Sequence, residues 1–276
     1  MTPSIQTLSE QLKTRFQQEG RGLGDGAHYV PGRVVRDMGG MGRMHRFACA
    51  RCGGRQIVLS SDMILSVFLE EHWNFFTLDI KEYYPLIDIE RTQWIAELME
   101  LRHPKLRDGS PAMLTTSLLV CRQEADEIQW HAIEIVSSRL ARNAPLSAAT
   151  QIKQEYWRRL GVSFRVVYSE GLNSHRARHL WNLFNIGERV IARGLTGDEM
   201  AVQRAILERF RVAKDATLLE LCHRTAALNG LGRGDCVAAM WRLIAVRVVE
   251  CSLDVPELLA QPCRGARICA VQKELR

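Results

Sequence analysis

The pattern of apolar residues changes near residue 170, and this change constrains the fold more than any single motif. Before it, short apolar runs typical of strands occur at 117–122, 129–136 and 163–168, between stretches with helical spacing. After it, helical spacing dominates. Since 276 residues are enough for two modest domains, we expect an α+β protein with a mixed α/β domain over residues 1–170 and a mostly helical domain over residues 171–276.

Several further elements are expected in the first domain. The patterns predict helices at 4–18, 60–71, 90–101 and 147–160, a hairpin at 43–59 and a short strand at 77–80. The glycine-rich segment 20–26 lacks the Lys-Ser/Thr of a phosphate-binding loop, and no apolar strand precedes it. It is therefore interpreted as a flexible connector.

The second domain reads as three helices followed by a β-ribbon, which is the order of a winged helix. Val202 and Ile206 mark the first helix, residues 217–225 form the second, and Val237 and Ile244 mark the third. A strand is expected over residues 247–253. The third helix carries Arg242, with Arg233 before it and Arg247 after it. Two interpretations stay open: DNA contact by this helix, or a winged helix that docks on protein or is purely structural.

Composition narrows the class of protein. The chain is 46% hydrophobic and 25% charged, which excludes global disorder, and the longest apolar stretch is too short and too charged to span a membrane. No secretory signal is visible at the N-terminus, so we expect a cytoplasmic protein whose eight cysteines are reduced. The net charge of +6 permits a polyanionic partner.

The charge is unevenly distributed. Residues 1–60 carry a net +5, residues 136–170 a net +4 and residues 171–276 a net +5, whereas residues 61–135 carry a net −8. A polyanion would therefore meet the two basic ends of the chain before its acidic middle.

Cys49 and Cys52 form a CxxC at the tip of the expected hairpin. A structural zinc ion needs four ligands. His45 is near in sequence, but no second CxxC or close Cys/His pair follows. The alternatives are a zinc site and two thiols on a turn.

An ordered series of short motifs resembles TnsA, the end-cleaving endonuclease subunit of heteromeric, Tn7-type transposons. The series covers about the first 170 residues, whereas the C-terminal match is only architectural. Its pieces are Gly20-Arg21-Gly22 with Tyr29 and Pro31, Gly42-Arg43 with His45-Arg46, Ser60 with Asp62, Val67-Phe68-Leu69, Trp73, Leu78-Asp79-Ile80-Lys81-Glu82 with Tyr84-Pro85-Leu86, Leu119-Val120, Ala132-Ile133, Tyr156-Trp157 and 164–168.

The resemblance implies a restriction-endonuclease-like first domain and a winged-helix second domain. In the family, the nuclease domain cuts the 5′ ends of the transposon, an integrase-fold transposase cuts and joins the 3′ ends, and the C-terminal domain docks on an AAA+ ATPase regulator. DNA at the transposon ends, the transposase and the regulator are therefore the expected partners, without a membrane. The expected DNA-binding side chains are Arg21, Arg43, Arg46, Arg233, Arg242 and Arg247.

The family's chemistry needs two carboxylates that hold Mg²⁺ and a lysine beside them. The corresponding positions here are Ile64, Ser117 and Val136, and the acid Glu134 stands where the family has glutamine. We therefore expect no catalytic residues, no bound metal and no cofactor. The most economical interpretation is a catalytically inactive TnsA-like subunit that binds transposon-end DNA and bridges transposase and regulator.

Two alternatives stay open. The first is an active Mg²⁺-dependent endonuclease with a relocated site, using Glu134 or nearby acids such as Asp62, Glu70, Glu71 and Asp79; the absence of a lysine near Val136 counts against it. The second is a winged-helix DNA-binding regulator without a transposase partner. His72, His103, His131 and Cys121 are interpreted as packed or surface residues.

Overall fold

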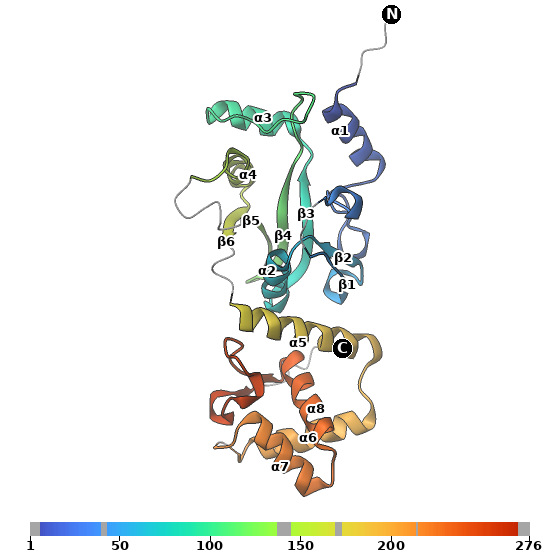
Figure 1. The fold of residues 1–276 in the computed structure, drawn as a ribbon, viewed down its shortest axis with the longest axis vertical. Helices are drawn as coiled ribbons and strands as arrows, with labels where there is room; N and C mark the ends of the chain where they lie inside the picture. The colour runs from blue at the N-terminus through green and yellow to red at the C-terminus, as the bar shows by residue number, and fades with distance from the viewer. Residues whose placement is uncertain (1–5, 40–42, 137–144, 169–172, 214, 270–276) are drawn as a thin grey trace, which may run out of the picture. The chain divides into compact units, whose positions relative to one another are not determined.

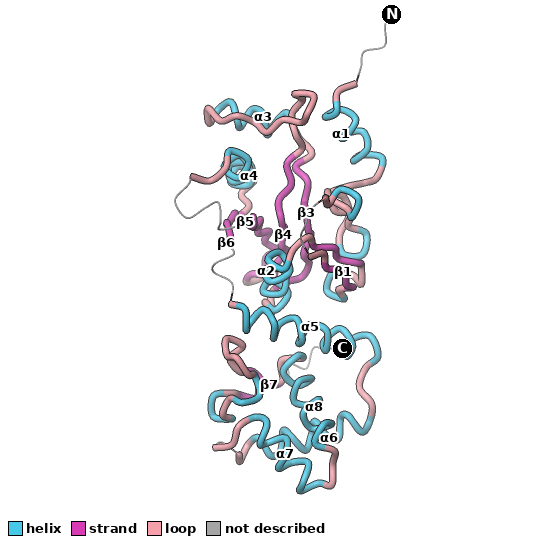
Figure 2. Tube along the Cα trace, in the orientation of Figure 1, coloured by secondary structure: helices cyan, strands magenta, loops and turns pink. Residues whose placement is uncertain are grey.

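The computed structural model describes residues 6–39, 43–136, 145–168, 173–213 and 215–269. The chain forms two compact units, Met1–Leu172 (unit 1) and Asn173–Arg276 (unit 2), and each is described by itself (Figure 1). Unit 1 mixes helices with a four-stranded sheet and unit 2 is mostly helical, as Figure 2 shows by colour. The chain is an α+β protein.

The central sheet of unit 1 has the strand order β3 (Thr77–Leu86), β4 (Leu114–Glu124), β5 (Glu127–Val136) and β6 (Ser163–Tyr168). The first three strands are antiparallel neighbours, and β5 pairs with β6 in parallel. A parallel pair requires a crossover connection, which here contains helix α4 (Ala148–Arg159). The strand expected at 77–80 is the start of β3, which continues through Leu86.

Unit 1 contains three further α-helices in the described ranges. They are α1 (Leu8–Gln18), α2 (Asp62–Trp73) and α3 (Ile89–Leu98). Thr7 and Glu10 form a capping box at the start of α1, and Ser61 caps α2 by accepting a hydrogen bond from the N–H of Ile64. The Ser61 cap fixes where α2 begins, close to the sheet.

The expected hairpin is present as β1 (His45–Ala48) paired with β2 (Gln56–Leu59). Its turn contains a short 3₁₀ helix, Ala50–Cys52, followed by Gly53 at φ 71°. This left-handed conformation suits glycine, which has no Cβ.

The glycine-rich segment 20–26 is not a flexible connector, so that prediction is wrong. A Cβ added to Gly22 would lie 2.6 Å from Pro85 of β3, and Arg21 beside it is only 1% exposed. The segment therefore packs closely against the sheet, and its glycines serve close backbone approach and positive φ.

The core of unit 1 joins α3 and α4 to the sheet. Leu119 and Ala132 are paired across β4 and β5, and they belong to one buried cluster with Ile152 and Trp157 of α4. The Trp157 indole N–H donates a 2.8 Å hydrogen bond to the Thr116 hydroxyl. This bond satisfies a buried donor and fixes α4 against β4.

Unit 2 contains α5 (Ser174–Arg193), α6 (Gly197–Phe210), α7 (Leu218–Asn229), α8 (Arg233–Ala245) and a two-stranded ribbon of β7 (Val249–Glu250) and β8 (Arg267–Ile268). Helix α8 contacts α5, α6 and α7, so it lies at the centre of the helical packing. Its Ala239, Met240 and Leu243 are buried.

Two expectations for unit 2 are corrected. Residues 174–193 form a 20-residue helix that the sequence patterns missed, so four helices precede the ribbon. The strand expected over 247–253 has only two residues, because Arg247 takes a left-handed conformation at φ 59° and the ladder does not extend past Glu250. The apolar residues Leu180, Leu183 and Phe184 recur at helical spacing in the missed helix and are buried, whereas β-propensity gives little indication that the strand ends so early.

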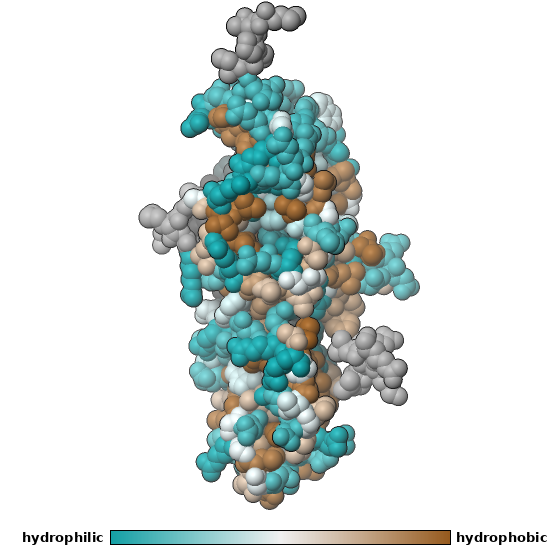
Figure 3. Space-filling view, turned by 90° about the vertical axis from the view of Figure 1, so that its right-hand side faces the viewer, coloured by the Kyte–Doolittle hydropathy of each residue, from teal (hydrophilic) through white to brown (hydrophobic). Residues whose placement is uncertain are grey.

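Every helix in the described ranges is too short or too polar to cross a bilayer. On the face drawn in Figure 3, hydrophobic patches interrupt a largely hydrophilic surface.

Candidate functional site

A cavity of about 530 Å³ lies in unit 1, and we call it the unit 1 cavity. Several separate segments line it: helix α1, the glycine-rich loop, the start of α2, the strands and α4. Its lining residues are Leu12, Arg15, Phe16, Arg21, Gly32, Arg33, Asp37, Ser60, Ile64, Tyr83, Met113, Leu114, Thr115, Ser117, Glu134, Ile135 and Lys153.

Three positions correspond, by the resemblance, to the family's catalytic residues, and two of them line this cavity. Ile64 and Ser117 line it, whereas Val136 ends β5 and is not among the described lining residues. The Ser117 backbone N–H donates to Glu134 at 3.2 Å, and the Ser117 hydroxyl accepts from the N–H of Ile135 at 3.2 Å. Ser117 is therefore engaged in joining β4 to β5.

Glu134 lies in the cavity with a cationic partner that sequence reasoning missed. The Lys153 ammonium of α4 forms an ion pair with the Glu134 carboxylate and donates to the Thr115 carbonyl at 3.2 Å. The side chain of Lys153 is 7% exposed and that of Glu134 13%. A lysine thus does lie beside the candidate site, but it comes from α4. Helical spacing from Ile152 and Trp157 would have placed it on the inward side of the helix.

The second carboxylate in the cavity, Asp37, is also held by cations. It accepts hydrogen bonds from Arg15 at 2.8 Å and from Arg21 at 2.5 Å. Burial opposes ionisation of Asp37, but the Val34 N–H and the two guanidinium groups outweigh it and lower its pKa to about 2. Asp37 is therefore ionised at neutral pH.

Tyr83 is a strained residue at the cavity wall. It has φ 49° within β3, a conformation that is uncommon for any residue except glycine. Its hydroxyl accepts a 2.8 Å hydrogen bond from the Ser60 N–H, and its ring lies 5.8 Å from the Arg33 guanidinium carbon. These contacts place the residue before the Ser61 cap of α2 and the Arg33 guanidinium at the same wall of the cavity.

The other acids considered for a relocated site do not line the cavity. Asp62 is bonded to His45 at 2.7 Å, Asp79 accepts from the Gly26 N–H at 3.1 Å, and Glu71 is buried in ion pairs with Arg122 and Arg165. Glu70 is likewise absent from the described lining. These four acids therefore have separate places in unit 1.

The arginines expected to bind DNA in unit 1 differ in exposure. Arg43, which precedes β1, and Arg46, which belongs to β1, are both exposed. Arg21 is buried, and it donates to Glu19 at 2.6 Å, to Asp37 and to the Gly32 carbonyl at 2.9 Å. Only Arg43 and Arg46 present their charge to solvent.

The arginines expected to bind DNA in unit 2 also differ, some being exposed and others paired with acids. Arg233 is exposed at the first residue of α8, whereas Arg242 forms a 2.8 Å ion pair with Glu199 of α6. Arg247 lies 3.5 Å from Glu250. The DNA-binding role of all six arginines stays a prediction.

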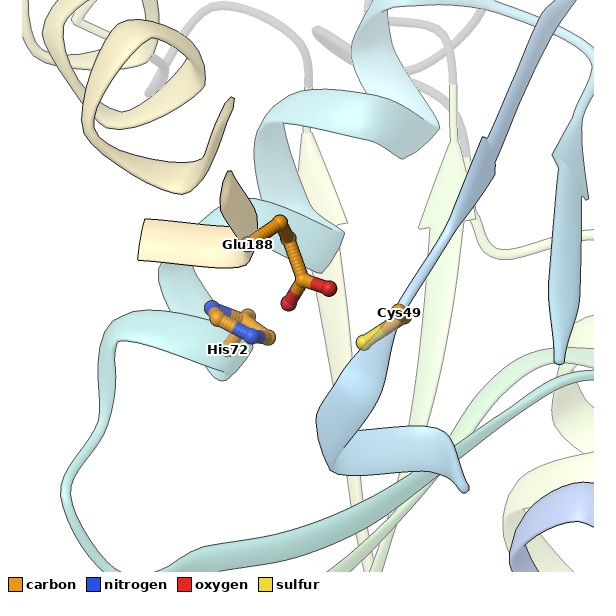
Figure 4. A group of neighbouring side chains, drawn as sticks. All are labelled: Cys49, His72 and Glu188. Atoms are coloured by element: carbon orange, nitrogen blue, oxygen red, sulfur yellow. The ribbon is translucent and has the colours of Figure 1, made fainter. Parts of the chain in front are cut away.

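The CxxC forms a buried thiol pair near His72. Figure 4 shows the side chains of Cys49, at the end of β1, and His72, on α2, pointing toward each other, and their ligand atoms lie within 4.8 Å. Glu188, also labelled there, belongs to α5 of unit 2. The Cys52 thiol and His72 together lower the Cys49 pKa to about 5, although burial opposes this. His45, the histidine near this pair in sequence, is bonded to Asp62 at 2.7 Å. The two alternatives for Cys49 and Cys52, a zinc site and two thiols on a turn, both stay open.

The remaining single residues pack as expected. His103 accepts or donates a 3.0 Å hydrogen bond with the Thr92 hydroxyl, and His131 does so with Ser163 at 2.7 Å. Cys121 is 6% exposed, and burial raises the pKa of its thiol. A nucleophilic cysteine needs a lowered thiol pKa instead.

The structure thus consists of an α/β unit with a cavity lined by charged side chains and a mostly helical unit. No family model matches the chain. The chain is 23% identical over 245 residues to the Transposon Tn7 transposition protein TnsA of Escherichia coli, an alignment that covers 89% of this chain and 87% of that protein. The resemblance to TnsA is therefore confirmed, and it extends into unit 2.

Proposed function

We propose that this chain is a catalytically inactive TnsA-like subunit of a DNA transposition complex. In this role it binds transposon-end DNA and bridges an integrase-fold transposase and an AAA+ regulator, with unit 2 as a winged helix. The similarity to TnsA over 89% of the chain supports the transposition role. The inactivity is supported by the lining of the cavity, where Ile64 and Ser117 stand at the positions for which the resemblance implies carboxylates.

The donor set of the cavity does not fit Mg²⁺. This ion needs several hard oxygen ligands in octahedral geometry. The Glu134 carboxylate, which accepts from the Ser117 N–H, and the carbonyl of Thr115 are both bonded to the Lys153 ammonium. A dication would have to displace this ammonium from a mostly buried ion pair, against the charge of Arg15, Arg21 and Arg33.

Inactivity has a physical consequence for the products of transposition. Without a cut at the 5′ ends, the element stays joined to the donor DNA, and a copy-in route through a cointegrate follows. Long-read sequencing of products made with the partner proteins should show cointegrates. End-labelled DNA should not be nicked by the purified complex with Mg²⁺ or Mn²⁺. Clean cut-and-paste products that require this chain would contradict the proposal.

One observation favours a second candidate, an endonuclease with a relocated site. Glu134 and Lys153 place an acid and a lysine in the same cavity, which are two of the group types that this chemistry uses. If this candidate is correct, nicking occurs with Mg²⁺ and is abolished in Glu134→Ala.

A third candidate, a winged-helix regulator, is favoured by the exposed Arg233 at the start of the central helix α8. It requires sequence-specific DNA binding through unit 2. Arg233→Ala and Arg242→Ala in the full chain should then weaken binding, and unchanged affinity in both would remove the support for this candidate.

A further inference from the structure

The unit 1 cavity has more positive than negative charge even though it lies at the family's metal-binding positions. Its described lining contains four cations, Arg15, Arg21, Arg33 and Lys153, and two carboxylates, Asp37 and Glu134. Glu19 lies outside the lining and accepts from Arg15, Arg21 and Arg36, so the wider group keeps its positive excess. An anion is the ligand that such a cavity attracts.

Lys153 is bonded to oxygens of the kind that a hard metal ion uses as ligands. Its ammonium is bonded to one carboxylate oxygen and one backbone carbonyl, which are hard oxygen ligands. An ammonium has three N–H donors, and the described residues account for two of them. The third donor is available to an oxygen of a ligand in the cavity.

Arg21 supplies a second, independent indication of a ligand. Its side chain is 1% exposed, and its Nη2 has no hydrogen-bond partner among the described residues. A buried guanidinium donor without an acceptor costs free energy, and such groups need an explanation. A phosphate oxygen satisfies guanidinium and ammonium donors equally well.

We propose that the unit 1 cavity binds a DNA backbone phosphate without a divalent cation, the ammonium of Lys153 taking the place of the metal. This inference rests on the proposed function, because it assigns the DNA contact of the inactive subunit to the former metal position. Glu134 then serves as a positioning residue that holds the ammonium in place. No bond is formed or broken, so the cavity holds DNA without cutting it.

The test is DNA binding by the full chain, measured by fluorescence anisotropy with a labelled transposon-end duplex. The central variant is the double substitution Glu134→Gln with Lys153→Met, which removes both charges at once and leaves no buried charge unpaired. Its matched control is Glu90→Gln with Lys13→Met, because Lys13 and Glu90 form an exposed 2.8 Å ion pair elsewhere in unit 1.

Wild-type affinity should differ less than about twofold between EDTA and Mg²⁺ at matched ionic strength, since no metal is used. The cavity variant should bind about tenfold more weakly and should lose about one unit of the slope of log K against log salt, as expected for one lost phosphate contact. The control variant should bind as the wild type does. Equal binding by the cavity variant and the wild type, or binding that EDTA abolishes, would overturn the inference.

A second arm separates a DNA phosphodiester from a small anion. Inorganic phosphate should compete with the duplex only weakly at constant ionic strength. Stronger thermal stabilisation by inorganic phosphate than by the duplex would assign the cavity to a small anion and overturn the DNA assignment. The nicking assay keeps the two proposals distinguishable: nicking contradicts the inactive subunit, whereas a cavity variant with full affinity and no nicking contradicts only the phosphate site.

Discussion

The two units each contain a cavity of about 530 Å³, but the charged residues that line the two cavities differ. The unit 1 cavity includes two carboxylates that its own cations bind. The cavity of unit 2 lies between α5 and α8, and its described lining contains Arg189, Arg193, Arg242 and Trp241 but no acid. Glu199, which is outside that lining, pairs with Arg193 and Arg242. Charges buried in pairs depend on their partners, whereas exposed pairs are screened by water.

The largest predicted effect follows from breaking the buried pair in unit 1. Glu134→Ala leaves the Lys153 ammonium, whose side chain is 7% exposed, without its carboxylate. We expect unit 1 to lose about 3 kcal/mol of stability. Hydrogen exchange of peptides from β4 and β5 measures this loss separately from unit 2.

The matched control for this prediction is Glu90→Ala, which breaks the exposed pair with Lys13 and should cost less than about 1 kcal/mol. The double variant Glu134→Gln with Lys153→Met should recover most of the loss. If Glu134→Ala lowered stability no more than Glu90→Ala does, burial would not explain a difference in energy between the two ion pairs.

The next effect concerns Arg21, the buried cation of the glycine-rich loop. Arg21→Met removes bonds to Glu19, Asp37 and the Gly32 carbonyl and keeps most of the packing against Phe16. We expect a loss of about 2 kcal/mol, because hydrogen bonds of charged groups contribute about 1.5–3 kcal/mol but the two acids retain other cations. Chemical denaturation gives the value, and Arg36→Met, which removes an exposed partner of Glu19, should have little effect.

A smaller effect is expected from acid. The pKa of Asp37 is lowered from 3.8 to about 2, so the folded state favours the carboxylate. This stabilisation is complete above pH 4 and is lost as the pH falls from 4 to 2. After solvent screening it is worth at most about 1 kcal/mol. The difference in stability between Asp37→Asn and the wild type should therefore decrease as the pH falls from 4 to 2. A difference that stays constant in acid titrations would contradict the lowered pKa of Asp37.

The sequence predicted most elements of unit 1 because their signals are local. The apolar run at 129–136, the Ser61 cap and the turn at Gly53 each specify structure within a few residues. Lys153 and Asp37 could not be assigned in this way. They reach the cavity from segments far from Ser117 in the chain, and only the tertiary packing of α4 and of the 3₁₀ turn Val35–Asp37 brings them together. Helix α5 also has a local signal, because Leu180, Leu183 and Phe184 recur at helical spacing, although the predicted elements do not include it.

The smallest effect is expected in unit 2. Glu199 pairs with Arg193 and Arg242 and accepts from the Thr196 N–H, and these contacts, with the Arg193 hydrogen bond the largest, lower its pKa to about 2. The Glu199 side chain is 17% exposed and that of Arg193 is 51% exposed, so water screens this pair more than the Glu134–Lys153 pair, and Glu199→Gln should leave stability almost unchanged. The same substitution frees Arg193 and Arg242 beside the unit 2 cavity, so DNA affinity should rise if that cavity binds phosphate. Anisotropy and hydrogen exchange on the same variant separate the two readouts: a stability loss as large as that of Glu134→Ala would remove the contrast between buried and exposed pairs.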